Sequence, residues 1–130
     1  MTPFIWDASI KLSTAKGEAS FWGTGDETRD WIHADDAAEL IAGLSETDAP
    51  FSIVNGASGT RVTVNAVLEM LKEALGVDIA ITFNGAKRPG DPRFYHADVS
   101  ELTRLGLAPK IALADGLNRY AEWFKRTWSR

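Results

Sequence analysis

The chain has 130 residues, of which 45% are hydrophobic and 25% are charged, and its formal net charge at pH 7 is −4. These values are typical of one soluble globular domain spanning residues 1–130, and the acidic balance argues against a general nucleic-acid-binding role. The absence of cysteine excludes disulfides and thiolate metal sites, and no apolar run approaches the roughly 18 residues of a membrane span. The N-terminus shows no secretory signal, so we expect a cytoplasmic protein without a membrane partner.

The first segment of the chain has the pattern of a helix followed by a short strand. Thr2 and Pro3 suit an N-cap and a first helical position, and apolar residues then recur at helical spacing as far as Leu12. Gly17 ends this pattern, because glycine commonly follows the last turn of a helix. Residues 19–22 are apolar and alternate weakly, which predicts a short strand before a glycine-rich loop.

A second strand and an amphipathic helix are predicted after that loop. Residues 31–33 have the pattern of a short strand, and Asp35 or Asp36 then suits the N-cap of a helix. The apolar face of this helix consists of Ala37, Leu40, Ile41 and Leu44. Residues 51–54 predict a short buried strand that ends at an Asn-Gly turn and needs a sheet to join.

The second half of the chain alternates in the same way. Thr63 suits the N-cap of a helix that Gly76 ends, and residues 77–83 alternate as a strand does. The apolar face of that helix consists of Val64, Val67, Leu68, Leu71 and Leu75. Residues 84–97 form an irregular basic and aromatic segment, and residues 98–101 have the form of a capping box that opens a short helix.

A last amphipathic helix completes the pattern. Its apolar face consists of Leu113, Leu117, Tyr120, Ala121, Phe124 and Trp128. Helices and short strands therefore alternate along the chain, which predicts a mixed α/β fold. The strands are few and short for a self-sufficient sheet, so we expect this small lobe to complete something larger.

The glycine-rich loop is the first candidate binding element. Gly23 and Gly25 permit backbone conformations that other residues avoid, so the loop can turn sharply or lie flat against a ligand. Arg29 follows the loop, and its guanidinium has a rigid fork of donors that suits a phosphate or a carboxylate. The alternative interpretation is an ordinary surface loop with one exposed arginine.

The second candidate element is the segment 86–98, in which cations, prolines and aromatic residues are concentrated. Arg88 and Asp91 flank a Pro-Gly turn, so both side chains could point to one ligand. The arginine would then contact a phosphate, and the aspartate would accept from a sugar hydroxyl. Tyr95 and Trp22 offer planar faces for a base or a sugar. The alternative interpretation is a solvated loop on which Arg88 pairs with a local acid.

The two histidines, His33 and His96, do not point to catalysis or to a metal. Neither has further ligands at a metal-binding spacing, and His33 lies in an apolar stretch that favours a packed side chain. The sequence shows no Ser/His/Asp grouping and no Gly-x-Ser-x-Gly elbow. We therefore expect no metal site and no catalytic residue in this chain.

Five short motifs together resemble the carboxyl-terminal, substrate-binding part of the NAD-dependent epimerase/dehydratase family, the extended short-chain dehydrogenases that act on nucleotide sugars. They are Trp22-Gly-Thr-Gly-x-x-Thr-Arg-Asp-Trp-Ile-His-x-Asp-Asp36, Asn55-Gly-Ala-Ser-Gly-Thr, Arg88-Pro-Gly-Asp-Pro, Ala97-Asp-Val-Ser and Pro109-Lys-Ile-x-Leu-x-x-Gly-Leu. Each motif is weak alone, but the five occur in the family's order and at its spacing across nearly the whole chain. One departure is Ala112, where the family often has a serine or threonine that caps the last helix.

The resemblance implies a site for a nucleoside-diphosphate sugar, with a UDP-sugar favoured. It implies that Arg29 and Arg88 hold the diphosphate and that Asp91 binds the ribose. It further implies that a nucleobase lies along Ser20, Phe21 and Trp22, and that Tyr95 borders the site. Two guanidiniums from separate segments suit a pyrophosphate better than either would alone.

The sequence lacks the cofactor-binding half that the resemblance leads us to expect before this segment. Thr28 stands where a third glycine of a dinucleotide-binding turn belongs, and neither tyrosine has a lysine four residues on. We therefore expect no cofactor in this chain, although the parent family uses NAD or NADP, and we expect the truncated chain to be inactive alone. We also expect a homo-oligomer or a missing Rossmann domain as partner, because residues 51–54 would otherwise expose apolar surface. The alternative function is a non-catalytic module that binds nucleotides or associates with itself.

Overall fold

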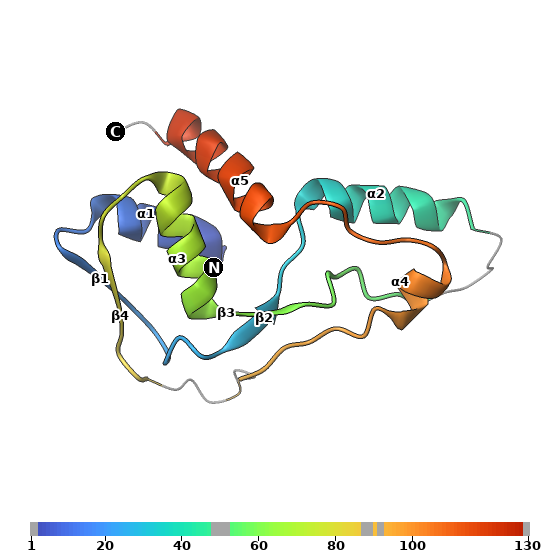
Figure 1. Cartoon of the computed structure of the whole chain (residues 1–130), viewed down its shortest axis with the longest axis horizontal. Coiled ribbons are helices and arrows are strands. Elements are labelled where there is room, and N and C mark those ends of the chain that lie inside the picture. The colour runs from blue at the N-terminus through green and yellow to red at the C-terminus, as the bar shows by residue number, and fades with distance from the viewer. Residues whose placement is uncertain (1–2, 48–52, 87–89, 91–92, 129–130) are drawn as a thin grey trace.

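Three helices gather at one end of the molecule beside a pair of parallel strands, and two further helices lie toward the other end (Figure 1). The structure is a computed structural model, and it describes residues 3–47, 53–86, 90 and 93–128. At the first end are α1 (Phe4–Thr14), α3 (Val64–Leu75) and α5 (Leu113–Thr127), with β1 (Glu18–Phe21) and β4 (Ala80–Phe83). Toward the other end are α2 (Ala34–Ser45) and α4 (Ser100–Arg104), and between the ends lie β2 (Thr28–Asp30) and β3 (Arg61–Thr63).

The described strands form two separate two-stranded sheets. Strands β1 and β4 pair in parallel, with Phe21 opposite Phe83, whereas β2 and β3 pair antiparallel, with Thr28 opposite Thr63. A single parallel bridge joins Thr28 to Phe94, which brings the segment 93–95 alongside β2. The mixed α/β class predicted from the sequence is therefore confirmed.

The hydrophobic core lies where α1, α3 and α5 meet the inner side of β1. Its largest fully buried apolar side chains are Leu12, Val67, Leu68, Leu71 and Phe124. The two helices with the strongest apolar periodicity, α3 and α5, supply most of them, as their sequence patterns predict. This core carries β1, and β1 leads directly into the glycine-rich loop.

The ends of α3 and α5 also follow the sequence prediction. The hydroxyl of Thr63 accepts the N–H of Ala66 at 3.2 Å, and Gly76 ends the helix in the left-handed conformation with a φ of 70°. Helix α5 begins after Ala112, whose side chain makes no capping hydrogen bond. The start of α5 therefore lacks the side-chain cap that a serine or threonine at position 112 would supply.

Several predicted elements lie elsewhere. The second strand covers residues 28–30 instead of 31–33, because β3 offers its hydrogen-bonding edge only to that stretch. Strand β4 begins at Ala80, later than the alternating pattern at residue 77. The segment 53–54 is not a strand, and Ile53 is 90% exposed because no sheet edge lies beside it in the described chain; residues 51–52 lie outside the described residues.

The caps of α2 and α4 differ from the predicted ones. His33 caps α2, with its Nδ1 accepting the N–H of Asp35 at 3.1 Å, because the carboxylate of Asp36 bonds elsewhere. Before α4, the carboxylate of Asp98 accepts the N–H of Ser100 at 2.9 Å, and the reciprocal half of a capping box is replaced by an ion pair between Glu101 and Arg104. None of the described helices is long and apolar enough to cross a membrane.

Candidate functional site

An open hollow of about 530 Å³ lies beside β2, at the place where three segments from different parts of the chain meet. One segment is the end of β2, the second precedes β3 and the third follows the bridge at Phe94. The residues that line the hollow are Arg29, Asp30, Asn55, Tyr95, His96, Ala97 and Asp98. Arg29 and Tyr95, which the sequence singled out separately, are thus brought to one site.

The position of Arg29 is set by its own strand and by Tyr95. Its Nη1 donates to the carbonyl oxygen of Thr28 at 2.8 Å, and its Cζ lies 5.3 Å from the centroid of the Tyr95 ring. The N–H of Tyr95 donates to that same carbonyl at 3.0 Å, so the arginine and the ring are fixed to one peptide group. A guanidinium stacked on an aromatic ring can still present its edge to an oxyanion.

Hydrogen bonds from side chains hold the walls of the hollow together. The carboxylate of Asp30 accepts the N–H of Ser58 at 2.8 Å, the hydroxyl of Ser58 at 2.6 Å and the N–H of Gly59 at 3.0 Å. His96 Nε2 lies 3.2 Å from the carbonyl oxygen of Gly59, and Asn55 Nδ2 donates to the carbonyl of Asp98 at 2.9 Å. These contacts tie the two loops that form the walls to the end of β2.

The other predicted site residues differ in their exposure to solvent. Ser20 and Trp22 are exposed on and just after β1, whereas Phe21 points inward, is only 6% exposed and packs on Phe83 with 6.3 Å between ring centroids. The alternation of a strand explains this difference, since neighbouring side chains lie on opposite faces. The predicted residues Arg88 and Asp91 lie outside the described residues.

Sequence reasoning missed the polar residues that build the walls. Asp30 and Asn55 appear only as letters of longer motifs, Asp98 is predicted only as the cap of a short helix, and His96 is assigned no role. Their partners are mostly backbone groups of distant loops, and such partners leave no periodicity in the sequence. The adjacency of Asp30 to Arg29 is the one local signal that could have drawn attention to this wall.

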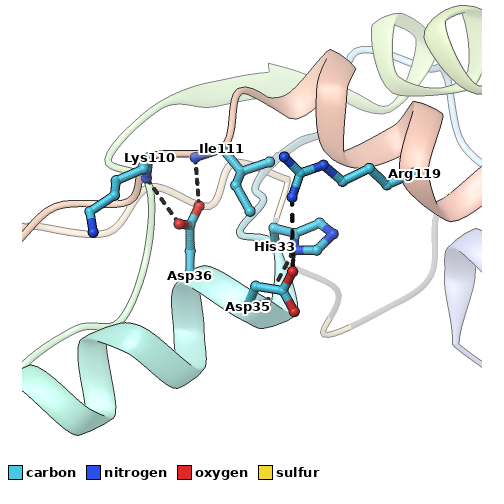
Figure 2. A network of polar contacts seen from close by, with 6 residues as sticks. All are labelled: His33, Asp35, Asp36, Lys110, Ile111 and Arg119. Carbon is cyan, nitrogen blue, oxygen red and sulfur yellow. Dashed lines mark hydrogen bonds and ion pairs between the residues drawn. The ribbon is translucent and has the colours of Figure 1, made fainter.

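A second polar network anchors α2 to the segment that leads into α5 (Figure 2). Asp36 is only 2% exposed, and its two carboxylate oxygens accept the N–H groups of Lys110 at 3.0 Å and Ile111 at 2.9 Å. The N–H of Lys110, together with that of Ile111 and against the opposing effect of burial, holds the pKa of Asp36 below its usual range. Asp35 lies 3.9 Å from Arg119 on the surface of the same network. The two hydrogen bonds of Asp36 join α2 to the segment before α5, so we assign this network a structural role.

The glycine loop does not fit the pyrophosphate of a dinucleotide. It joins β1 to β2, instead of leading from a strand into the N-terminus of a helix. The N–H groups of Thr24 and Gly25 are already bonded to the carboxylate of Glu27. Within the described residues, no group of three or more histidines and acids could hold a metal ion.

Comparisons of the sequence with known proteins point to one family. The sequence model of the "NAD dependent epimerase/dehydratase family" matches residues 3–57. The chain is 36% identical over 107 residues to a putative GDP-L-fucose synthase 2 of Arabidopsis thaliana. This match covers 82% of this chain and 32% of the relative. It is 30% identical over 110 residues to a dTDP-glucose 4,6-dehydratase of Streptomyces griseus. That match covers 82% of this chain and 34% of the relative.

Comparisons of the structure agree. A UDP-N-acetylglucosamine 4-epimerase from Methanobrevibacter ruminantium superposes with a TM-score of 0.85 at 24% identity, over 98% of this chain and 41% of that one, and shows the shared fold. A UDP-glucose 4-epimerase from Thermotoga maritima superposes with a TM-score of 0.82 at 26% identity, over 97% of this chain and 40% of that one. In sequence and in fold the chain therefore belongs to the NAD-dependent epimerase/dehydratase family, and it spans about a third of the length of the curated relatives it matches.

Proposed function

We propose that the chain binds a nucleoside-diphosphate sugar, with the diphosphate at Arg29 and the rest of the ligand in the hollow beside Tyr95. The observation that carries this proposal is the guanidinium of Arg29, which lines the hollow and is held there by contacts that include the Thr28 carbonyl and the Tyr95 ring. Acceptors and donors of Asn55, His96 and Asp98 line the same hollow, and such groups suit the hydroxyls of a sugar. In this interpretation Arg88 supplies the second cation for the diphosphate.

The named ligands of the relatives support a nucleotide sugar and leave the base open. The Thermotoga maritima structure contains UDP-glucose, whereas the Arabidopsis thaliana relative is named for a GDP-linked sugar. We propose a UDP-sugar as the first ligand to test and a GDP-sugar as the second. Exposed Trp22, at the end of β1, is the described aromatic residue that we propose for contact with the base.

We further propose that this chain is the substrate-binding part of an epimerase or dehydratase. Hydride transfer to and from the sugar would then rely on NAD or NADP, which we place on a cofactor-binding part outside these 130 residues. The sequence supports this placement, because neither Tyr95 nor Tyr120 has a lysine four residues on. Ile53 and Ile41, 90% and 70% exposed, are available to contact such a part or a second copy of the chain.

Titration of the purified chain with UDP-glucose, GDP-mannose and NAD, followed by two-dimensional amide NMR, tests the proposal. We expect an affinity of about −4 to −6 kcal/mol for the better nucleotide sugar, because one open hollow leaves the ligand partly in water. Arg29→Lys should weaken it about tenfold, since lysine cannot replace a bidentate contact. Arg126→Lys, an exposed change on α5, is the matched control. Equal binding by the two variants would refute the assignment of Arg29.

The alternative of a self-associating module has one supporting observation, the exposure of Ile53 and Ile41. Light scattering during size-exclusion chromatography separates the two functions. A dimer that an Ile53→Ser change converts to a monomer, in a chain that binds no nucleotide sugar, would favour the interaction module. A monomer that binds nucleotide sugars would favour the substrate-binding part.

A further inference from the structure

The glycine-rich loop folds around a carboxylate that belongs to the chain itself. The side chain of Glu27 turns back on the loop and accepts the N–H of Thr24 at 3.0 Å and the N–H of Gly25 at 2.9 Å. The hydroxyl of Thr24 adds a third donor at 3.3 Å. Successive N–H groups that converge on one anion form the concave backbone arrangement known as a nest.

The backbone of the loop is built to keep that carboxylate in place. Gly23 and Gly25 both have positive φ angles, 92° and 85°, and a Cβ atom on Gly23 would lie 2.8 Å from the Glu27 carboxylate. A Cβ atom on Gly25 would lie 2.6 Å from the ring of Phe83, so the loop is also pressed onto β4. Burial opposes the ionisation of Glu27, but the N–H groups of Thr24, Glu27 and Gly25 and the hydroxyl of Thr24 together outweigh it and hold the pKa of its carboxyl below the usual range.

The same loop fixes the start of α3 and of β2. The carbonyl oxygen of Gly25 accepts the N–H of Asn65 at 3.0 Å, and the carbonyl oxygen of Glu27 accepts the N–H of Val64 at 2.8 Å. Arg29 lies two residues beyond Glu27 on β2. A displacement of the Glu27 side chain would therefore reach both the first turn of α3 and the strand that carries Arg29.

We propose that residues 23–25 form a binding site for a small oxyanion of the carboxylate type, which Glu27 fills from within the chain, and that Glu27 is thereby a positioning residue for Arg29. The N–H groups of Thr24 and Gly25 then do not contact the ligand, because Glu27 already occupies them. Its role is to hold Trp22 at one end and Arg29 at the other at a fixed separation. The effect on ligand binding rests on the proposed nucleotide-sugar site, whereas the occupied nest does not.

The first experiment removes the Glu27 carboxylate from the nest and supplies an external anion in its place. Glu27→Ala removes the internal carboxylate, and we expect the amide proton resonances of Thr24 and Gly25 to move upfield. Sodium acetate added to this variant should return them in a saturable manner, while sodium chloride at equal ionic strength should not. Asp26→Ala is the matched control, because the adjacent Asp26 carboxylate receives only a long 3.4 Å contact from the Thr24 hydroxyl.

Unmoved Thr24 and Gly25 resonances in Glu27→Ala would overturn the proposal, and so would a variant whose shifted resonances do not respond to acetate. Should Glu27→Ala fail to fold, Glu27→Gln tests the same point, since one carbonyl oxygen still accepts an N–H but the charge is lost. We expect Glu27→Gln to move the two resonances part of the way. Resonances at their native positions in Glu27→Gln would show that the negative charge is not what the nest binds.

The second experiment measures nucleotide-sugar affinity in the same variants. Glu27→Ala should weaken nucleotide-sugar binding roughly two- to tenfold, the range expected if a displaced Arg29 loses one hydrogen bond to the diphosphate, and acetate should restore it. The nucleotide-sugar affinity of Asp26→Ala, measured with and without acetate, shows whether acetate competes with the diphosphate for its site. Native affinity in Glu27→Ala would refute the positioning role. Failure of the native chain to bind any nucleotide sugar would refute the proposed function. The occupied nest would still be tested by the amide resonances of Thr24 and Gly25.

Discussion

Replacing Asp30 by asparagine should loosen the wall of the hollow without changing the packing of the hydrophobic core. The carboxylate of Asp30 accepts three hydrogen bonds, two from Ser58 and one from the N–H of Gly59. The asparagine carbonyl can keep the bonds to Ser58, but its NH₂ group then faces the N–H of Gly59 and cannot accept it. Because hydrogen bonds to charged groups contribute roughly 1.5–3 kcal/mol, we expect a loss of about 2 kcal/mol in the free energy of unfolding.

Urea denaturation followed by circular dichroism measures this change, and amide NMR locates it. Asp30→Asn should lower the urea midpoint and move the Gly59 amide resonance, while the α5 resonances stay in place. Asp78→Asn, an exposed change between α3 and β4, is the matched control and should alter stability by less than about 0.5 kcal/mol. Equal midpoints for the two variants would show that Asp30 does not hold the loop at Ser58 and Gly59.

Three further changes test the core, a helix cap and the buried carboxylate. Leu71→Ala should cost about 2–5 kcal/mol of unfolding free energy, because Leu71 is fully buried in α3, and urea denaturation measures this loss. Ala112→Ser should add about 0.5–1 kcal/mol by capping α5, seen as a higher thermal midpoint. The lowered pKa of Asp36 contributes stability that is present above about pH 4 and lost as the pH falls through the folded-state value. Asp36→Asn should therefore unfold at lower urea at pH 7 and show a smaller difference between pH 7 and pH 3.

Elements whose signals are local could be predicted from the sequence. Helix α3 has its apolar face, the Thr63 cap and the Gly76 stop within one continuous stretch, and all three are confirmed. Strand β2 could not be placed, because its position depends on the edge of β3, whose residues lie more than thirty positions further along the chain. The cap of α2 was assigned to an aspartate because aspartates cap well, but the distant N–H groups of Lys110 and Ile111 engage Asp36. Long-range backbone donors decided both cases.

The candidate site shows the same division. Arg29 and Tyr95 were identified from their chemistry, and the parallel bridge between Thr28 and Phe94 explains why they meet, but no sequence pattern predicts that bridge. Glu27 stands at an unspecified position of the glycine-rich motif, so the motif assigns it no role. Its role depends on the positive φ angles of two glycines, which turn the Thr24 and Gly25 N–H groups toward one point.

The charge balance of the hollow limits how an anion can bind there. The described lining has one guanidinium, Arg29, and two carboxylates, Asp30 and Asp98. Both carboxylates accept backbone N–H groups, which hold the carboxylates in place but do not neutralise their charge. A diphosphate beside Arg29 alone would therefore meet a net negative site, and Coulomb repulsion would offset much of its attraction to the arginine. The proposed function thus requires a second cation close to the hollow, and Arg88 in the Arg-Pro-Gly-Asp motif is the residue from which the sequence can supply it.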